Sequence, residues 1–169
     1  LYNTLMKKIL SLFLLIFITA CSQPKGMPYT LEFRDKGVGG LNAMTPFNEA
    51  KITASLLGFK LNSYTRFEAG VPKPMFLVRR ADENILEIYP TQDKRYIERI
   101  ESRSLHVKNK KNIKLGNVLQ DSQECSPDAY YDNKLLCYIS DNVAILYEQN
   151  SNKELIATMM VWIRHDRSL

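Results

Sequence analysis

The stretch Leu155-Ile-Ala-Thr-Met-Met-Val-Trp-Ile-Arg164 decides how the folded part of this chain is built. Successive side chains of a β-strand point to opposite faces, so the stretch presents two rows. Both rows are largely apolar: Ile156, Thr158, Met160 and Trp162 on one face, and Ala157, Met159, Val161 and Ile163 on the other. A strand with two apolar faces is buried on both sides. We therefore expect this strand to lie in the centre of a sheet.

Shorter stretches of strand-like residues flank turn signals elsewhere in the chain. The sequence predicts two hairpins, with turns at Ala81–Asn84 and Ser140–Asn142. Ile113–Leu119 contains Gly116 and predicts a strand end with a brief helical turn. The remaining predicted strands are 31–33, 61–67, 75–80, 85–89, 96–102, 135–139 and 143–147.

One helix is predicted near the start of this region. Thr45-Pro46 combines a hydroxyl cap with a proline in the first helical position. Phe47, Ala50, Ala54 and Leu57 follow at helical spacing, and Gly58 is placed to end the helix. The glycines at 37, 39 and 40 precede it and permit close backbone approach or positive φ.

These elements predict an α+β fold, an antiparallel sheet with a helix packed on it. Their order also suggests a duplication of one module, in which a glycine-led entry and a helical piece precede three strands. The first copy would span Gly37–Ser104, and the second would run from Ile113 to the end of the sequence.

The first 21 residues have the layout of a secretory signal peptide. Met6-Lys7-Lys8 is a positive start, and Ile9–Ile18 is an apolar run interrupted by Ser11. The run has ten residues, whereas a membrane-spanning helix needs about 20. Two small residues precede Cys21, as in the cleavage site of bacterial lipoproteins. An ordinary secretory cleavage site that happens to contain a cysteine is the alternative.

This interpretation divides the chain into three parts. Residues 1–20 are the signal peptide, with its effective start at Met6, and 21–34 are the lipidated Cys21 and a flexible tether. Residues 35–169 form a single α+β periplasmic domain. In bacterial lipoproteins an aspartate directly after the cysteine retains the protein in the inner membrane. Ser22 occupies that position here, so we expect the protein to be anchored at the periplasmic face of the outer membrane.

The two remaining cysteines, Cys125 and Cys137, are expected to form a disulfide, because this compartment is oxidising. In the chain-entropy model such a bridge contributes about 3 kcal/mol. A metal site would need more soft ligands close by, and a catalytic thiol would need a basic partner from His106 or His165. We predict no metal centre, no cofactor and no catalytic residues.

The 23 basic and 18 acidic residues of the chain fall to 21 and 18 once Lys7 and Lys8 leave with the signal, a net charge of +3. The strongest asymmetry lies between 94 and 114. Its candidate contacts to an anionic surface are Lys94, Arg95, Lys108, Lys110, Lys111 and Lys114. Anionic lipid headgroups or an acidic envelope protein are the partners that we expect for these basic residues. We do not expect nucleic acid as a partner in this compartment. A solvated face that keeps the protein soluble is the alternative.

The stretch Asp35-Lys-Gly-Val-Gly-Gly-Leu-Asn-Ala-Met-Thr-Pro-Phe-Asn-Glu-Ala-Lys-Ile52 resembles the opening block of the RpoE-regulated lipoprotein family, which is YfeY-like. Members carry D/E-x-G-V-G-x-L-x-A-x-T-P-x-x-E-x-x-I. The closing Val161-Trp-Ile-Arg164 is similar to the terminal strand of that family, and the late cysteine pair agrees. The resemblance implies an envelope location and expression under the envelope-stress sigma factor. It implies no known biochemical activity.

Two functions follow as hypotheses. The first is a membrane-anchored periplasmic lipoprotein, not an enzyme, with a binding or structural role in the envelope. The second is a small periplasmic enzyme or enzyme inhibitor, which rests on fold analogy alone.

Overall fold

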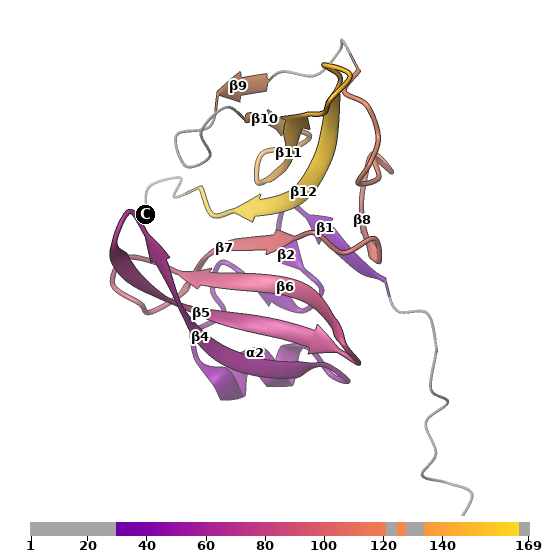
Figure 1. Cartoon of the computed structure of the whole chain (residues 1–169). Helices are drawn as coiled ribbons and strands as arrows, with labels where there is room; N and C mark the ends of the chain where they lie inside the picture. The colour runs from indigo at the N-terminus through magenta and orange to yellow at the C-terminus, as the bar shows by residue number, and fades with distance from the viewer. Residues whose placement is uncertain (1–29, 121–124, 128–133, 166–169) are drawn as a thin grey trace, which may run out of the picture.

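The computed structural model describes residues 30–120, 125–127 and 134–165. Within them, twelve strands form two sheets and one helix is present (Figure 1). The helix, α2, spans Glu49–Ser55. The strands are β1 Leu31–Arg34, β2 Gly37–Val38, β3 Leu41–Asn42, β4 Lys60–Glu68, β5 Val71–Arg80, β6 Glu83–Pro90, β7 Ile97–Ser102, β8 Val107–Asn109, β9 Cys125–Pro127, β10 Leu135–Tyr138, β11 Val143–Gln149 and β12 Leu155–Ile163.

The larger sheet consists of two antiparallel meanders joined at their last strands. Its order is β4-β5-β6-β7-β12-β11-β10-β9. The strand β12 therefore lies between β7 and β11, with Trp162 opposite Ile100 on one side and Val143 on the other. The predicted central position of β12 and both predicted hairpins are confirmed.

The expected α+β class is wrong, because strands dominate the described residues and α2 has only seven residues. Thr45 does not cap the helix. The backbone around it pairs with the start of β7: Ile97 N donates to Thr45 O and Phe47 N donates to Arg95 O. The helix begins only after this pairing, with Asn48 as its cap, and it buries Ile52 alone. Leu57, predicted on the buried stripe, is 84% exposed.

The helix expected in a second module is also absent from residues 113–120. There the chain runs alongside β12 instead, with Gly116 N donating to Ala157 O and Leu119 N donating to Leu155 O. Val118 forms an isolated bridge with Ile156. Each half of the large sheet has four strands, but in the described residues only the first half is preceded by a helix. No helix in the described part of the chain is long and apolar enough to cross a bilayer.

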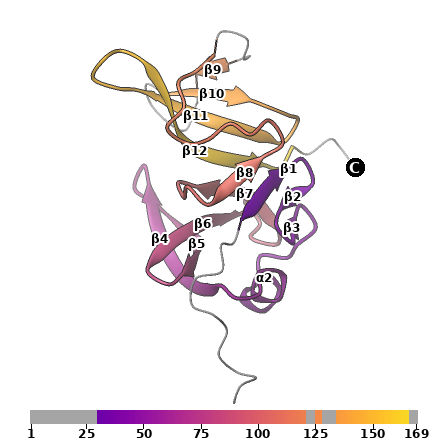
Figure 2. The ribbon, with the colours of Figure 1, turned by 90° about the vertical axis from the view of Figure 1, so that its right-hand side faces the viewer.

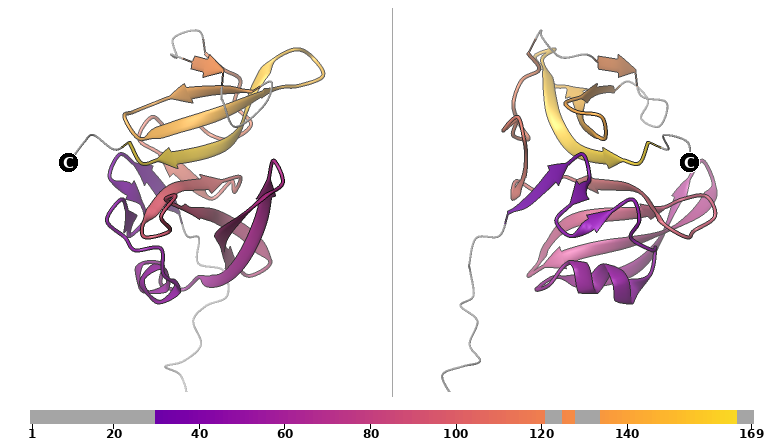
Figure 3. Two further views of the ribbon diagram at one scale, coloured as in Figure 1. Left: turned by 90° about the vertical axis from the view of Figure 1, so that its left-hand side faces the viewer. Right: turned by 180° about the vertical axis from the view of Figure 1, so that it is seen from behind.

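The smaller sheet, in the order β3-β2-β1-β8, covers one face of the larger one (Figure 2). Phe33, Val38 and Leu41 from this sheet enter the main core. Trp162 of β12 is buried in the same core, and its Nε1 donates to Asp35 O at 3.0 Å. The helix α2 packs against the β4 end of the large sheet (Figure 3). A second, smaller cluster that includes Met159 and Val161 lies on the opposite face of β12.

Gly37, the first residue of β2, allows the backbones of β2 and β3 to approach each other closely at the edge of the smaller sheet. Its φ is +147°, and a Cβ there would lie 1.8 Å from the carbonyl oxygen of Leu41. Gly70 also has positive φ, but a Cβ there would meet no atom within 4 Å. The expectation that a glycine of the 37–40 segment permits close approach is therefore confirmed.

We predict that Gly37→Ala lowers the free energy of unfolding by about 3 kcal/mol or more, because backbone must shift to admit the methyl group. The matched control, Gly70→Ala, meets only the cost of a left-handed conformation, about 1 kcal/mol. Urea unfolding of the two variants measures the difference. Equal losses would show that the close approach at Gly37 has no energetic weight.

Candidate functional site

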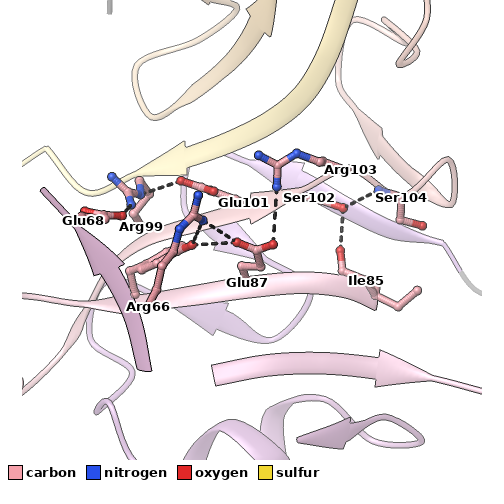
Figure 4. A network of polar contacts seen from close by, with 10 residues as sticks. Arg66, Glu68, Ile85, Glu87, Arg99, Glu101, Ser102, Arg103 and Ser104 are labelled. Carbon is pink, nitrogen blue, oxygen red and sulfur yellow. Dashed lines mark hydrogen bonds and ion pairs between the residues drawn. The ribbon is translucent and has the colours of Figure 1, made fainter. Parts of the chain in front are cut away.

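A network of charged side chains lies on the large sheet, on the face opposite the main core (Figure 4). Alternation along β6 and β7 places it there: Ile88 and Ile100 enter the core, whereas Glu87 and Glu101 point to the other face. These two carboxylates are directly opposite each other across the β6–β7 ladder. Like charges in that position destabilise a sheet unless cations compensate them.

Three arginines supply that compensation. Arg66 Nη1 lies 3.1 Å from Glu87 Oε2, and Arg103 Nη1 lies 3.4 Å from Glu87 Oε1. Arg99 Nε lies 2.8 Å from Glu101 Oε1. The Glu101 side chain is completely buried, so its contact with Arg99 holds a charge pair away from water. Such a pair needs good geometry to offset the desolvation of both ions.

Tyr89 and Glu68 extend the network toward the β4–β5 hairpin. The Tyr89 hydroxyl donates to Glu87 at 2.6 Å and accepts from Arg66 at 2.6 Å, while the Arg99 guanidinium lies 4.4 Å from the Tyr89 ring centre. Burial, together with the charges of Glu101 and Glu87, raises the pKa of Tyr89. Burial opposes ionisation of Glu68, but contacts with Lys73 and Arg99 outweigh it and lower the Glu68 pKa.

A cavity of about 520 Å³ opens beside this network. It lies between the first residues of β5, the β6–β7 connection and the end of β12. Its walls include apolar side chains from β5 and β12 and the charged residues Lys73, Lys94, Glu98 and Arg99. The volume falls within the range of about 300–1,000 Å³ that is typical of pockets for small organic ligands.

Neither a metal cluster nor a histidine is associated with this cavity in the described residues. Within the described ranges, no three His, Cys, Asp or Glu residues are grouped so that they could hold a metal ion. His106 lies near Glu83, with Nε2 3.5 Å from the carboxylate, and His165 contacts the Tyr138 ring. Neither histidine lines the cavity.

The predicted basic segment does not form one surface. Lys94 and Arg95 lie in the connection before β7, whereas Lys108 lies on β8, after β7 has ended. We call the second group the basic end; it consists of the exposed residues Lys108, Lys110, Lys111 and Lys114. Lys108 and Lys114 line a cleft of about 280 Å³ together with Thr30 and His106.

Asn109 fixes the shape of the loop that carries the basic end. Its side chain is buried, and its Oδ1 accepts from the backbone N–H groups of Lys111 and Ile113 at 3.0 and 3.3 Å. Its Nδ2 donates to Ile113 O at 2.7 Å. The exposed lysines thus project from a loop whose backbone is held by a buried amide.

The two late cysteines face each other across the β9–β10 ladder. Their sulfur atoms lie 2.08 Å apart in a disulfide, which agrees with the predicted bridge between Cys125 and Cys137. Cys21 and residues 22–29 of the proposed tether lie outside the described residues, whereas the last part of that segment, Leu31–Arg34, is not a tether but the strand β1.

The sequence reasoning missed the carboxylates of the network. Glu87 and Tyr89 alternate with the apolar Leu86 and Ile88, and this pattern could have marked one polar face of β6. Arg99 and Arg103 lie within the basic stretch from 94 to 114, and the sequence does not distinguish them from its other cations. Nothing in the local sequence indicates that Glu101 is buried.

We predict that Glu101→Leu lowers the free energy of unfolding by about 3 kcal/mol, because it leaves Arg99 without its buried partner. The double variant Arg99→Met with Glu101→Leu should recover most of this loss. As a control, Glu148→Gln removes a half-exposed pair with Lys134 and should cost less than about 1 kcal/mol. Urea unfolding measures all three. A double variant no more stable than Glu101→Leu would contradict the prediction.

Comparison with solved structures identifies a protein with a similar fold. The crystal structure of the uncharacterised protein yfeY from Escherichia coli matches with a TM-score of 0.62 at 19% sequence identity, covering 82% of this chain and 100% of that one. At this identity the match shows the fold alone. A search of curated proteins finds no match.

A family model covers most of the folded region. It is described as "Protein of unknown function (DUF1131)" and matches residues 24–150. This range includes the glycine-led entry, the three carboxylates of the network (Glu68, Glu87 and Glu101) and the disulfide. The chain belongs to this family, and its YfeY-like character agrees with the resemblance found in the sequence.

Proposed function

We propose that this protein is a lipid-anchored protein of the bacterial envelope, held at the periplasmic face of the outer membrane, with a binding or structural role. The sequence from Met6 to Ser22 supports the anchor and the location. The proposal rests chiefly on one observation of the structure, the position of the basic end beside the start of the described chain. This position supports an orientation in which the basic end faces the membrane. Expression under the envelope-stress sigma factor stays a prediction.

The described chain begins beside the basic end. Leu31, the first residue of β1, pairs in parallel with Val107 of β8, next to Lys108. Thr30 lines the same cleft as Lys108 and Lys114. Thr30 is the ninth residue after Cys21, which corresponds to at most about 30 Å of extended chain. A lipid at Cys21 would therefore keep this end of the domain close to the membrane.

The four lysines of the basic end then supply a second attachment. A cation near an anionic membrane surface contributes about 1 kcal/mol, and the effect falls off within a Debye length. Stable anchoring commonly combines acyl chains with a polybasic patch. The domain would rest on its basic end and direct the rest of its surface toward the periplasm.

The alternative, a small periplasmic enzyme or inhibitor, has one observation in its favour: the cavity beside the network contains titratable side chains. We favour a binding or structural role because the charged groups beside the cavity are held in ion pairs with one another. Groups that are paired in this way position the strands and are not poised as an acid or a base for a reaction.

The anchor is tested with Cys21→Ser. We expect the unchanged protein to incorporate labelled palmitate in bacterial cells and to fractionate with outer membranes, and the variant to lose the label and the membrane fraction. Ser22→Asp, which leaves the cysteine intact, should keep the label and move the protein to the inner membrane. Equal labelling of the protein and the Cys21→Ser variant would refute lipidation at this residue.

The basic end is tested on vesicles, using the unlipidated Cys21→Ser chain. Replacing Lys108, Lys110, Lys111 and Lys114 with glutamine should reduce co-sedimentation with vesicles that contain anionic phosphatidylglycerol, and should remove most of its salt dependence. A control variant with glutamine at Lys36, Lys51, Lys60 and Lys153 carries the same net charge on other parts of the surface. Equal binding of the two variants would show that net charge alone is responsible.

A further inference from the structure

The cavity beside the network has two apolar walls that come from distant parts of the chain. Val71, Pro72 and Pro74 line one side, at the start of β5, and Val161 and Ile163 line it at the end of β12. Proline has no backbone N–H donor, and its ring loses little conformational entropy on binding. These walls suit a slender apolar group more than a polar one.

The charges around the cavity favour an anion. Four cations of the adjacent network (Arg66, Lys73, Arg99 and Arg103) contact three carboxylates (Glu68, Glu87 and Glu101). Lys94 and Glu98, both exposed and both lining the cavity, add one charge of each sign. The local balance is therefore one positive charge in excess. Such fields select the sign of a charged ligand more than they set its affinity.

Lys94 is an exposed cation in the lining of the cavity. It is in the connection between β6 and β7, and the backbone of that connection is held by Thr91 and Asp93: Lys94 N donates to Thr91 O at 2.8 Å and Arg95 N donates to Asp93 Oδ1 at 3.1 Å. The ammonium group is thus carried on an ordered turn, beside the apolar walls of the cavity.

We propose that this cavity binds a single-chain amphiphile with one anionic headgroup, a medium-chain fatty acid being the simplest example. The chain lies between the β5 and β12 walls, and the carboxylate faces Lys94. The volume of about 520 Å³ suits one chain of this kind and not a two-chain phospholipid. The proposal rests on the described residues alone and does not depend on the lipid anchor.

Calorimetric titration with sodium decanoate tests the site, using the full chain carrying Cys21→Ser so that no detergent competes. We expect one decanoate bound per chain. Decyltrimethylammonium, with the same chain and the opposite charge, should bind at least about tenfold more weakly. Absence of decanoate binding, or equal binding of the two amphiphiles, would overturn the proposal.

Two variants place the ligand. Lys94→Glu should weaken decanoate binding about fivefold or more, whereas Lys51→Glu, the same charge change on exposed α2, should leave it unchanged. Val71→Trp should abolish binding by filling the cavity, and Val71 is exposed enough (57%) for the variant to fold. Equal effects of the two lysine variants, or decanoate binding that survives Val71→Trp, would place the ligand elsewhere and overturn the proposal.

Discussion

The pairing of β7 with β12 is the constraint on which the rest of the structure depends. It joins the last strands of two meanders that are otherwise separate, and the register sets Ile100 against Trp162 and Glu101 against Val161. Trp162 and Ile100 are buried in the main core, and the Trp162 indole donates to the backbone at Asp35. One pair of strands therefore fixes both halves of the large sheet and attaches the smaller sheet to them.

The opposite face of the same pair of strands explains the charged network and the cavity. Around β12 this face is apolar, with Met159 and Val161 buried, whereas toward β6 it carries carboxylates. Glu101 lies at the boundary and has no exposed surface, so its charge must be met within the protein, by Arg99 among others. The cavity opens where the apolar and charged parts of this face meet, which gives it an amphipathic lining.

The sequence predicted the long strands because alternation over many residues is a strong signal. In β12 a register shift interrupts the two predicted rows, so that Ala157 lies in the main core with Met160 and Trp162. The sequence predicted the fold class wrongly because Thr45-Pro46 is a good helix start in isolation, while in the fold its backbone pairs with residues 95–97. Strands such as β2 and β8 have two and three residues, too few for any periodicity. The network escaped prediction since Arg66, Glu87 and Glu101 meet only through strand register.

The basic run from Lys94 to Lys114 shows why charge along a chain does not define a surface. The strand β7 lies within it, and six extended residues span about 20 Å. Lys94 is therefore carried at one end of β7 and the basic end at the other, while Arg99 between them turns inward to Glu101. A domain that rests on the basic end would hold its amphiphile cavity away from the point of attachment. Membrane contact and ligand binding would then use different cations, and neither would block the other.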